Sequence, residues 1–272
     1  MAIRDILVYH GNDPHNDTRM DIAVSAAKRH GARLTGLHVL TYPALPTYMQ
    51  VEVGREILEQ QMAAQREKAT AAEPVFMKRL SDAEVEGEWR LMEGDAIDAV
   101  NQSAHYADLV VVPQADPDTP TPYDNMADNL LMSSGRPLLI APYIGAAKSF
   151  GKRVLVAWNA SAQAARAVHD ALPFLMAADE VVVQSVNPRD DSHISGAEIG
   201  THLARHGVKV EVKRIVAPDL NVGDALLSAL SDNECDMLVM GGYGHSRIRE
   251  LALGGATRQI LQSMTVPVLM SH

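Results

Sequence analysis

The sequence predicts an α/β protein with two consecutive halves, each a doubly wound parallel sheet with helices on both faces. Two observations support this fold class. The chain of 272 residues carries an internal repeat, because segments of its first half recur in its second half. In addition, short apolar segments alternate with helical segments throughout the second half, which is the order of elements in a parallel sheet with crossover helices.

The repeat is clearest in "EGDAIDAVNQSAHYADLVVV" (93–112) and "VGDALLSALSDNECDMLVM" (222–240). Each has Gly-Asp-Ala at a helix start, then an acid (Asp108 or Asp236), then an apolar run. The offset between matching positions of the two halves is about 148 residues at the first strand and about 129 residues at these Gly-Asp-Ala segments. Roughly nineteen extra residues therefore lie between the second and third strands of the first half. We predict two domains, 1–147 with a helical insertion and 148–272.

The elements of the second half follow in order. Ser161 and Asn221 precede two helical segments as N-caps, and His206-Gly207 closes a third helix. The strand segments, such as "DEVVVQSV", are apolar along their whole length, as in strands that helices cover on both faces. We predict strands near 152–158, 180–186, 208–215, 236–241 and 266–271, and helices near 161–173, 194–206, 221–233 and 255–263.

Two features of the first half concern packing. The insertion segment 52–73 predicts an extended amphipathic helix that packs on its own domain, with a partner surface as the alternative. The last strands of the two halves, "LLIAP" and "VPVLM", are apolar edges without protecting charges. We therefore expect these two edges to cover each other, so that the halves form a pseudo-dimer within the chain; a homodimer would be an additional assembly.

Composition excludes several classes of protein. Lysine and arginine total 24 against 34 acids, and the net charge of −10 argues against nucleic acid as a partner. The single cysteine, Cys235, excludes an intrachain disulfide. The N-terminal segment "MAIRDILVYHGND" has no signal-peptide pattern, and no apolar run approaches the ~20 residues that span a bilayer. We expect a cytoplasmic protein with no membrane contact.

The segment "GGYGHSRIRELALGGATRQIL" (241–261) predicts a phosphate site. Gly241 ends a strand, and Gly244 follows where a turn needs positive φ or where backbone approaches a ligand. Gly254 and Gly255 precede a helix whose first N–H groups are free to bind an anion. Nearby positive charge comes from Arg247, Arg249 and Arg258. The alternative is that the glycines only cap helices and turn corners.

These residues resemble the universal stress protein family. Gly-x-x-Gly, nine residues, then Gly and a small residue is similar to the family's nucleotide-binding signature. "VLVAWNASAQAARAVHDALPFL" (154–175) resembles the family's first strand and helix, and "TVPVLMSH" resembles its last strand. The resemblance implies two five-stranded parallel sheets of order 3-2-1-4-5, and binding of ATP, with or without magnesium, in many members but not in all.

Carried over by position, the resemblance implies a nucleotide site in the second half. Val186 would present its backbone to adenine, Asn159 stands where ATP-binding members have Asp, and Gly255 stands where they have Ser or Thr. In the first half, Pro113 and Asp116 replace the first two glycines, so that half is expected to contribute packing alone. The predicted site residues are Asn159, Val186, Met240, Gly241, Gly244, His245, Ser246, Gly254, Gly255, Ala256 and Thr257.

Two functions fit this pattern. The first is a stress-response protein that binds an adenine nucleotide and acts as a sensor or regulator, at most a slow ATPase, with an unidentified protein partner. The second is a nucleotide-free interaction protein in which the glycine loop is only scaffold. No residue set supplies the nucleophile, base and orienting acid of covalent catalysis, and we assign no catalytic or metal-binding residue. His245 is the one plausible base near the loop.

Overall fold

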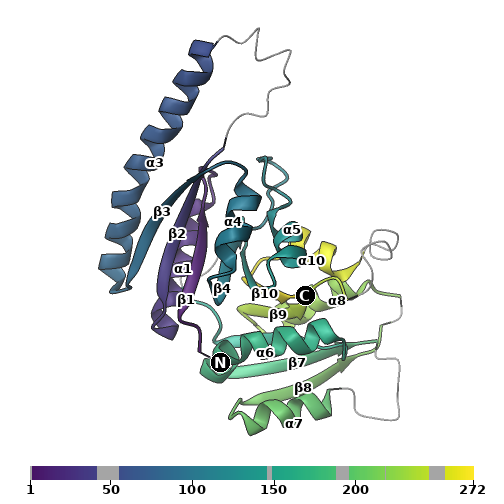
Figure 1. Cartoon of the computed structure of the whole chain (residues 1–272). Helices are drawn as coiled ribbons and strands as arrows, with labels where there is room; N and C mark the ends of the chain where they lie inside the picture. The colour runs from purple at the N-terminus through teal and green to yellow at the C-terminus, as the bar shows by residue number, and fades with distance from the viewer. Residues whose placement is uncertain (1, 42–54, 146–148, 188–195, 218, 245–254) are drawn as a thin grey trace.

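The computed structural model describes residues 2–41, 55–145, 149–187, 196–217, 219–244 and 255–272, except the side chains of 55–59 and 61. It is a three-layer α/β fold (Figure 1). The first half comprises β1 (Asp5–His10), α1 (Asn16–His30), β2 (Arg33–Leu40), α3 (Arg55–Ala83), β3 (Gly87–Glu93), α4 (Ala96–Ala104), β4 (Leu109–Pro113), α5 (Met126–Ser133) and β5 (Leu138–Ala141). The second half comprises β6 (Arg153–Ala157), α6 (Ala162–Ala177), β7 (Glu180–Val186), α7 (Ala197–Arg205), β8 (Val210–Ile215), α8 (Val222–Asp232), β9 (Met237–Gly241), α10 (Ala256–Ser263) and β10 (Val268–Ser271).

All ten strands form one sheet of order β3-β2-β1-β4-β5-β10-β9-β6-β7-β8. Each half has the predicted order 3-2-1-4-5 and is parallel throughout. The halves meet where β5 and β10 pair antiparallel, with Leu139 opposite Leu269. Both side chains are fully buried. The predicted pseudo-dimer is therefore confirmed, and the two edges that the sequence left unprotected cover each other.

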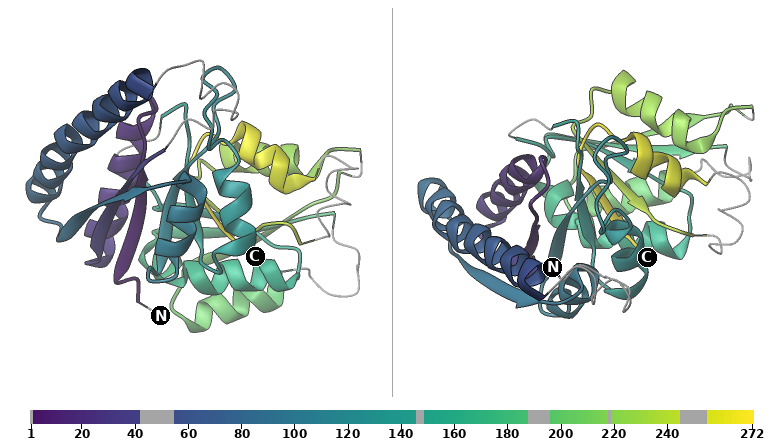
Figure 2. Two further views of the ribbon diagram at one scale, coloured as in Figure 1. Left: turned by 45° about the horizontal axis from the view of Figure 1, so that its top comes forward. Right: turned by 90° about the horizontal axis from the view of Figure 1, so that it is seen from above.

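Helices cover both faces of the sheet, and two apolar cores run through both halves (Figure 2). One core lies under α1, α3, α6 and α7, and the other lies under α4, α5, α8 and α10. The five strands predicted for the second half all fall within their expected ranges. Ser161 caps α6 by accepting from the Ala164 N–H at 3.1 Å, and Asn221 caps α8 by accepting from Gly223, as predicted.

Two helices run past the prolines at which the sequence predicted their ends. The insertion helix was expected over 52–73 and α6 over 161–173, but α3 continues through Pro74 and α6 through Pro173. A proline inside a helix costs about 3 kcal/mol. Beyond each proline the helix buries large apolar side chains against the sheet, Phe76 and Leu80 in α3 and Phe174 and Leu175 in α6. Such burial contributes about 1.5–3 kcal/mol per side chain, which offsets the proline.

The insertion helix packs on its own half, as predicted. Ala69, Phe76 and Leu80 form the apolar stripe, and they are buried while their neighbours on the helix are mostly exposed. Figure 1 shows α3 running along β3 at one end of the sheet. Within the described residues no helix, α3 included, combines the length and apolarity that a membrane crossing requires.

A second contact between the halves is made by α1 and α6. The imidazole of His30 lies edge-on against the Phe174 ring, 4.4 Å between centroids, and its buried Nε2 has no hydrogen-bond partner among the described residues. Burial, and then the neighbouring Arg29 charge, lowers the pKa of His30 to about 4. The Arg29 guanidinium meanwhile donates to the Gly151 carbonyl across the same junction.

We predict that replacing Leu269 by alanine lowers the free energy of unfolding by about 2–5 kcal/mol, because it opens a cavity between β5 and β10. Met176→Ala is the matched control, since Met176 is 58% exposed. Urea denaturation of the full chain measures both. Equal effects of the two changes would contradict the central role of this strand pair.

We also predict that acid weakens the fold through His30. In the unfolded chain its pKa returns to about 6.5, so the unfolded state takes up the proton more readily. The stabilisation is complete above pH 6.5 and is lost as the pH falls from there toward 4. His30→Gln should flatten this part of the stability profile, measured by urea denaturation between pH 7.5 and 5. His169→Gln, at an exposed histidine of α6, should leave the profile unchanged.

Candidate functional site

The carboxyl ends of β6, β7, β8 and β9 lie along one edge of the second half, where ligands of such sheets bind. Five of the predicted site residues lie at or near this edge. Asn159 follows β6, Val186 ends β7, Gly241 ends β9, Gly244 lies in the loop after it, and Gly255 precedes α10. Of the other predictions, His245, Ser246 and Gly254 lie outside the described residues, as do Arg247 and Arg249.

Gly241 is required by packing within the second half. A Cβ at this position would lie 2.5 Å from the Ala164 nitrogen and the Gln163 carbonyl carbon. Those atoms belong to the first turn of α6, so the end of β9 runs directly against the start of that helix. The Met240 side chain is also structural, because it is buried in the core under α8 and α10. These two residues can offer a ligand only their backbone.

Gly244 is not required by the packing of the residues around it. A Cβ there would lie 3.5 Å from Gln163 Oε1 and 3.6 Å from Ser161 Oγ, which are ordinary contact distances. The sequence left two explanations, a positive φ or the close approach of a ligand. The left-handed residue of this loop is instead its neighbour Tyr243, with φ of 51°. Gly244 is exposed, and none of the described residues would clash with a side chain at this position.

The N-terminus of α10 lies beside this loop. Gly255 is the N-cap and has no side chain to bond the free amides of the first turn, and Ala256 is half-buried behind it. Thr257 is buried, and its hydroxyl accepts from the Tyr243 N–H at 3.1 Å. The hydroxyl therefore fixes the loop to the helix. Within the described part of the chain no side chain caps the first turn, so its backbone amides suit an anion, and the exposed Arg258 adds positive charge.

Asn159 is held in a turn. Its Oδ1 accepts from the Ser161 N–H at 3.1 Å and from the Ser161 hydroxyl at 2.7 Å. The following residue, Ala160, has φ of 57°, so the chain turns sharply into α6. Position 159 thus offers a neutral amide NH₂ toward solvent and no negative charge.

An apolar rim flanks the end of β7. Asn187 ties the loops after β7 and β8 together, because its side chain exchanges two hydrogen bonds with the Ala217 backbone, at 2.7 and 2.9 Å. Three apolar side chains at the same edge are left exposed, Val216 by 66%, Leu220 by 45% and Val222 by 39%. Sequence patterns did not single them out, although Val216 directly follows β8 and Val222 begins α8. Together with Val186 they suit a flat apolar ring.

At the matching edge of the first half, side chains bond to one another across the position of Asp116. At the end of β4, the Asp116 carboxylate accepts from the Thr119 hydroxyl at 2.5 Å, pairs with His15 Nε2 at 2.7 Å and accepts from the Asp118 N–H. These hydrogen bonds lower the pKa of Asp116 to about 2. The space left around Pro113 and Asp116 is about 10 Å³, room for about one water molecule. In the first half, the side chains of Asp116, Thr119 and His15 thus lie at the position that corresponds to the predicted phosphate site of the second half.

A buried ion pair anchors this filled region, and sequence patterns missed it. Arg19 of α1 is 1% exposed and bonds the Asp13 carboxylate at 2.7 Å and the Tyr9 carbonyl at 2.7 Å. Burial alone would raise the pKa of Asp13, but the hydrogen bonds and charge of Arg19 outweigh it and lower the pKa. An arginine on a helix is usually solvated, so its position along the chain carries no signal of burial.

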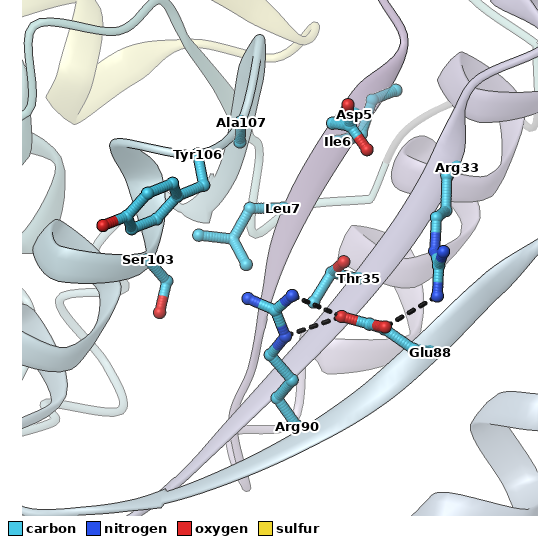
Figure 3. Close-up of a pocket in the computed structure, with 10 residues that line it drawn as sticks. All are labelled: Asp5, Ile6, Leu7, Arg33, Thr35, Glu88, Arg90, Ser103, Tyr106 and Ala107. Carbon is cyan, nitrogen blue, oxygen red and sulfur yellow. Dashed lines mark hydrogen bonds and ion pairs between the residues drawn. The ribbon is translucent and has the colours of Figure 1, made fainter.

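A cavity of about 110 Å³ lies at the opposite edge of the first half (Figure 3). It opens between the amino ends of β1, β2 and β3 and the end of α4. Its two arginines already share one carboxylate, since Glu88 bonds Arg33 at 2.6 Å and Arg90 Nε at 2.6 Å. Figure 3 shows Glu88 lying between them. Glu88 offsets one of the two positive charges, and the cavity lies at the amino ends of the strands, opposite the edge where ligands of such sheets bind.

Comparison with known proteins gives a consistent result. Residues 151–272 match the Universal stress protein family. Universal stress protein Slr1230 of Synechocystis sp. (strain ATCC 27184 / PCC 6803 / Kazusa) is 31% identical over 150 residues, which are 52% of this chain and 49% of that protein. The match thus spans about half the length of the curated relative.

Two solved structures share the fold over nearly the whole chain. A universal stress protein from Archaeoglobus fulgidus DSM 4304 superposes with a TM-score of 0.78 at 17% identity, covering 98% of this chain and 95% of that one. A functionally unknown protein from Pseudomonas aeruginosa PAO1 gives 0.64 at 15% identity, covering 99% and 92%. At these identities the likeness establishes the tandem fold.

The geometry predicts that the two glycines respond differently to substitution. Gly241→Ala should destabilise the chain by about 1–3 kcal/mol, because the added methyl group overlaps the first turn of α6. Gly244→Ala should change the free energy of unfolding by less than about 0.5 kcal/mol. Urea denaturation of both variants measures the difference, and a large loss in Gly244→Ala would show that this glycine is structural after all.

Proposed function

Because residues 151–272 belong to the universal stress protein family and the first half repeats their fold, we propose that the chain binds one adenine nucleotide, ATP, through its second half. In this proposal the protein is a sensor or regulator in a stress response, and an unidentified protein partner responds to its nucleotide state. The observation that carries the proposal is the exposed Gly244, which no described residue crowds, beside the N-terminus of α10, whose N-cap Gly255 has no capping side chain.

The described residues fit a nucleotide in three places. The amides of the first turn of α10 and the bare backbone at Gly244 suit phosphate oxygens, which need donors and close approach. The end of β7 at Val186 and the apolar rim of Val216, Leu220 and Val222 suit the adenine ring. The full predicted set, Asn159, Val186, Met240, Gly241, Gly244, His245, Ser246, Gly254, Gly255, Ala256 and Thr257, remains part of the proposal.

A single site per chain follows from the contrast between the halves. Pro113 has no N–H to offer a phosphate, and the ionised Asp116 would repel one. The hydrogen bonds of the Asp116 carboxylate to Thr119 and His15 also run across the position that a phosphate would take. The first half is thus expected to take no nucleotide, and its role lies in packing against the second half.

We further propose that any hydrolysis is slow. Bound ATP would supply a phosphoryl group, whose transfer to water needs a positioned base and neutralisation of charge. Asn159 has no charge with which to hold magnesium, and its Oδ1 is engaged by Ser161. The described part of the site therefore contributes binding and orientation, and a bound nucleotide would persist long enough to act as a signal.

The second candidate is a nucleotide-free interaction protein. It is favoured by Gly241, where packing alone accounts for the absence of a side chain. Its neighbour Gly242 is explained in the same way, because a Cβ there would overlap the Leu131 side chain of α5. Gly244 is the residue on which the two candidates differ, because the packing of the described residues does not account for its missing side chain.

We expect isothermal titration of the full chain with ATP to give one site per chain. Gly244→Val should abolish binding, because its branched side chain would fill the space left for the phosphates. Ala115→Val, at the matching loop of the first half, is the control and should bind as the unaltered chain does. Two equivalent sites would overturn the single-site proposal, and no binding by the unaltered chain would favour the nucleotide-free candidate.

A further inference from the structure

We propose that the first half positions the glycine loop of the second half, through a brace formed by Asp128 and Leu131 of α5 with Tyr243 and Gly242. The inference rests on the proposed function, because it assigns positioning residues to the proposed nucleotide site. It gives the half without a site of its own a specific part in binding.

Tyr243 is bonded at both ends, once to each half. Its hydroxyl donates to the Asp128 carboxylate of α5, and its backbone N–H donates to the Thr257 hydroxyl in the first turn of α10. The residue is 9% exposed and lies in the core shared by the two halves. Its φ of 51° is disfavoured for a bulky side chain and persists only where neighbours hold it. These bonds set the path of the chain into Gly244.

Gly242 brings the two halves into direct contact. The place that a side chain would take at this position is filled by Leu131 of α5, which is itself 3% exposed. The Gly242 N–H donates to the Ser271 carbonyl, and its carbonyl lies 3.0 Å from Nδ1 of His272. Each side of Gly242 is therefore occupied, so Gly242 itself has little freedom to move as long as α5 stays in place.

The Tyr243–Asp128 hydrogen bond of the brace has no equivalent between the matching residues of the two halves. One contact of the brace does have an equivalent on the other side of the pseudo-twofold axis. Gln114 matches Gly242 and Leu261 matches Leu131, and the Gln114 side chain donates to the Leu261 carbonyl at 3.0 Å. The Tyr243–Asp128 pair is different, because the matching residues are Ala115 and Arg258, which cannot form this hydrogen bond. The Tyr243–Asp128 hydrogen bond therefore holds the residue before Gly244. The matching loop of the first half, which contains Asp116, lacks such a bond.

The test uses Tyr243→Phe, which keeps the ring and removes the hydroxyl, and Asp128→Ala, singly and together in the full chain. Amide hydrogen exchange over 242–244 and 255–263 is measured without nucleotide, and ATP affinity is measured by titration. Each single variant should raise exchange of the hydrogen-bonded amides of Gly242, Tyr243 and Gln259 about tenfold and weaken ATP binding about tenfold, as for loss of a bond to a charged group. The double variant should be no worse than either single one.

Asp98→Ala is the matched control, because Asp98 is also an acid in the first turn of a first-half helix, α4, but is exposed. It should change neither measurement. Unchanged exchange in Tyr243→Phe would overturn the brace, and faster exchange with unaltered affinity would overturn its role in positioning. Faster exchange together with no ATP binding by the unaltered chain would support the brace and refute the proposed function.

Discussion

The antiparallel pairing of β5 with β10 is the interaction on which the other features depend. It joins two five-stranded sheets into one and buries two apolar edges that would otherwise template aggregation. It also places α5 and α10 side by side on the same face, over one continuous core. The contacts of Leu131 with Gly242 and of Gln114 with Leu261 exist only because this pairing brings each half within reach of the other.

The repeat made most of this fold predictable from the sequence. Asp108 and Asp236 were aligned from the sequence repeat alone, and in the structure both have the same physical role. Each carboxylate accepts hydrogen bonds from the backbone at the start of its half, from Arg4 and Asp5 in one case and from 151–153 in the other. Strand positions and helix caps could be predicted from local sequence patterns. The ends of α3 and α6 could not, because each helix continues past its proline through packing against residues far away in the sequence.

The candidate site was less predictable, for a related reason. In the sequence, Gly241, Gly242 and Gly244 are one cluster with one apparent purpose. In three dimensions they differ, because α6 fills the place beside the first, α5 fills the place beside the second, and nothing in the described chain fills the place beside the third. Tyr243 carries no local signal, since its partner Asp128 is 115 residues away. Spacing predicts where a ligand loop begins, but it does not separate glycines made necessary by the protein from those left open.

Covalent linkage of the two halves has a consequence for how such a molecule can change. When two identical chains associate, every substitution appears on both sides of the twofold axis, so a residue that benefits one site must also be tolerated at the other. Here Ala115 and Tyr243 occupy equivalent places and differ, as do Asp128 and Arg258. One gene thus encodes two unequal surfaces, and each half has been free to change without the symmetry that an assembly of identical subunits imposes.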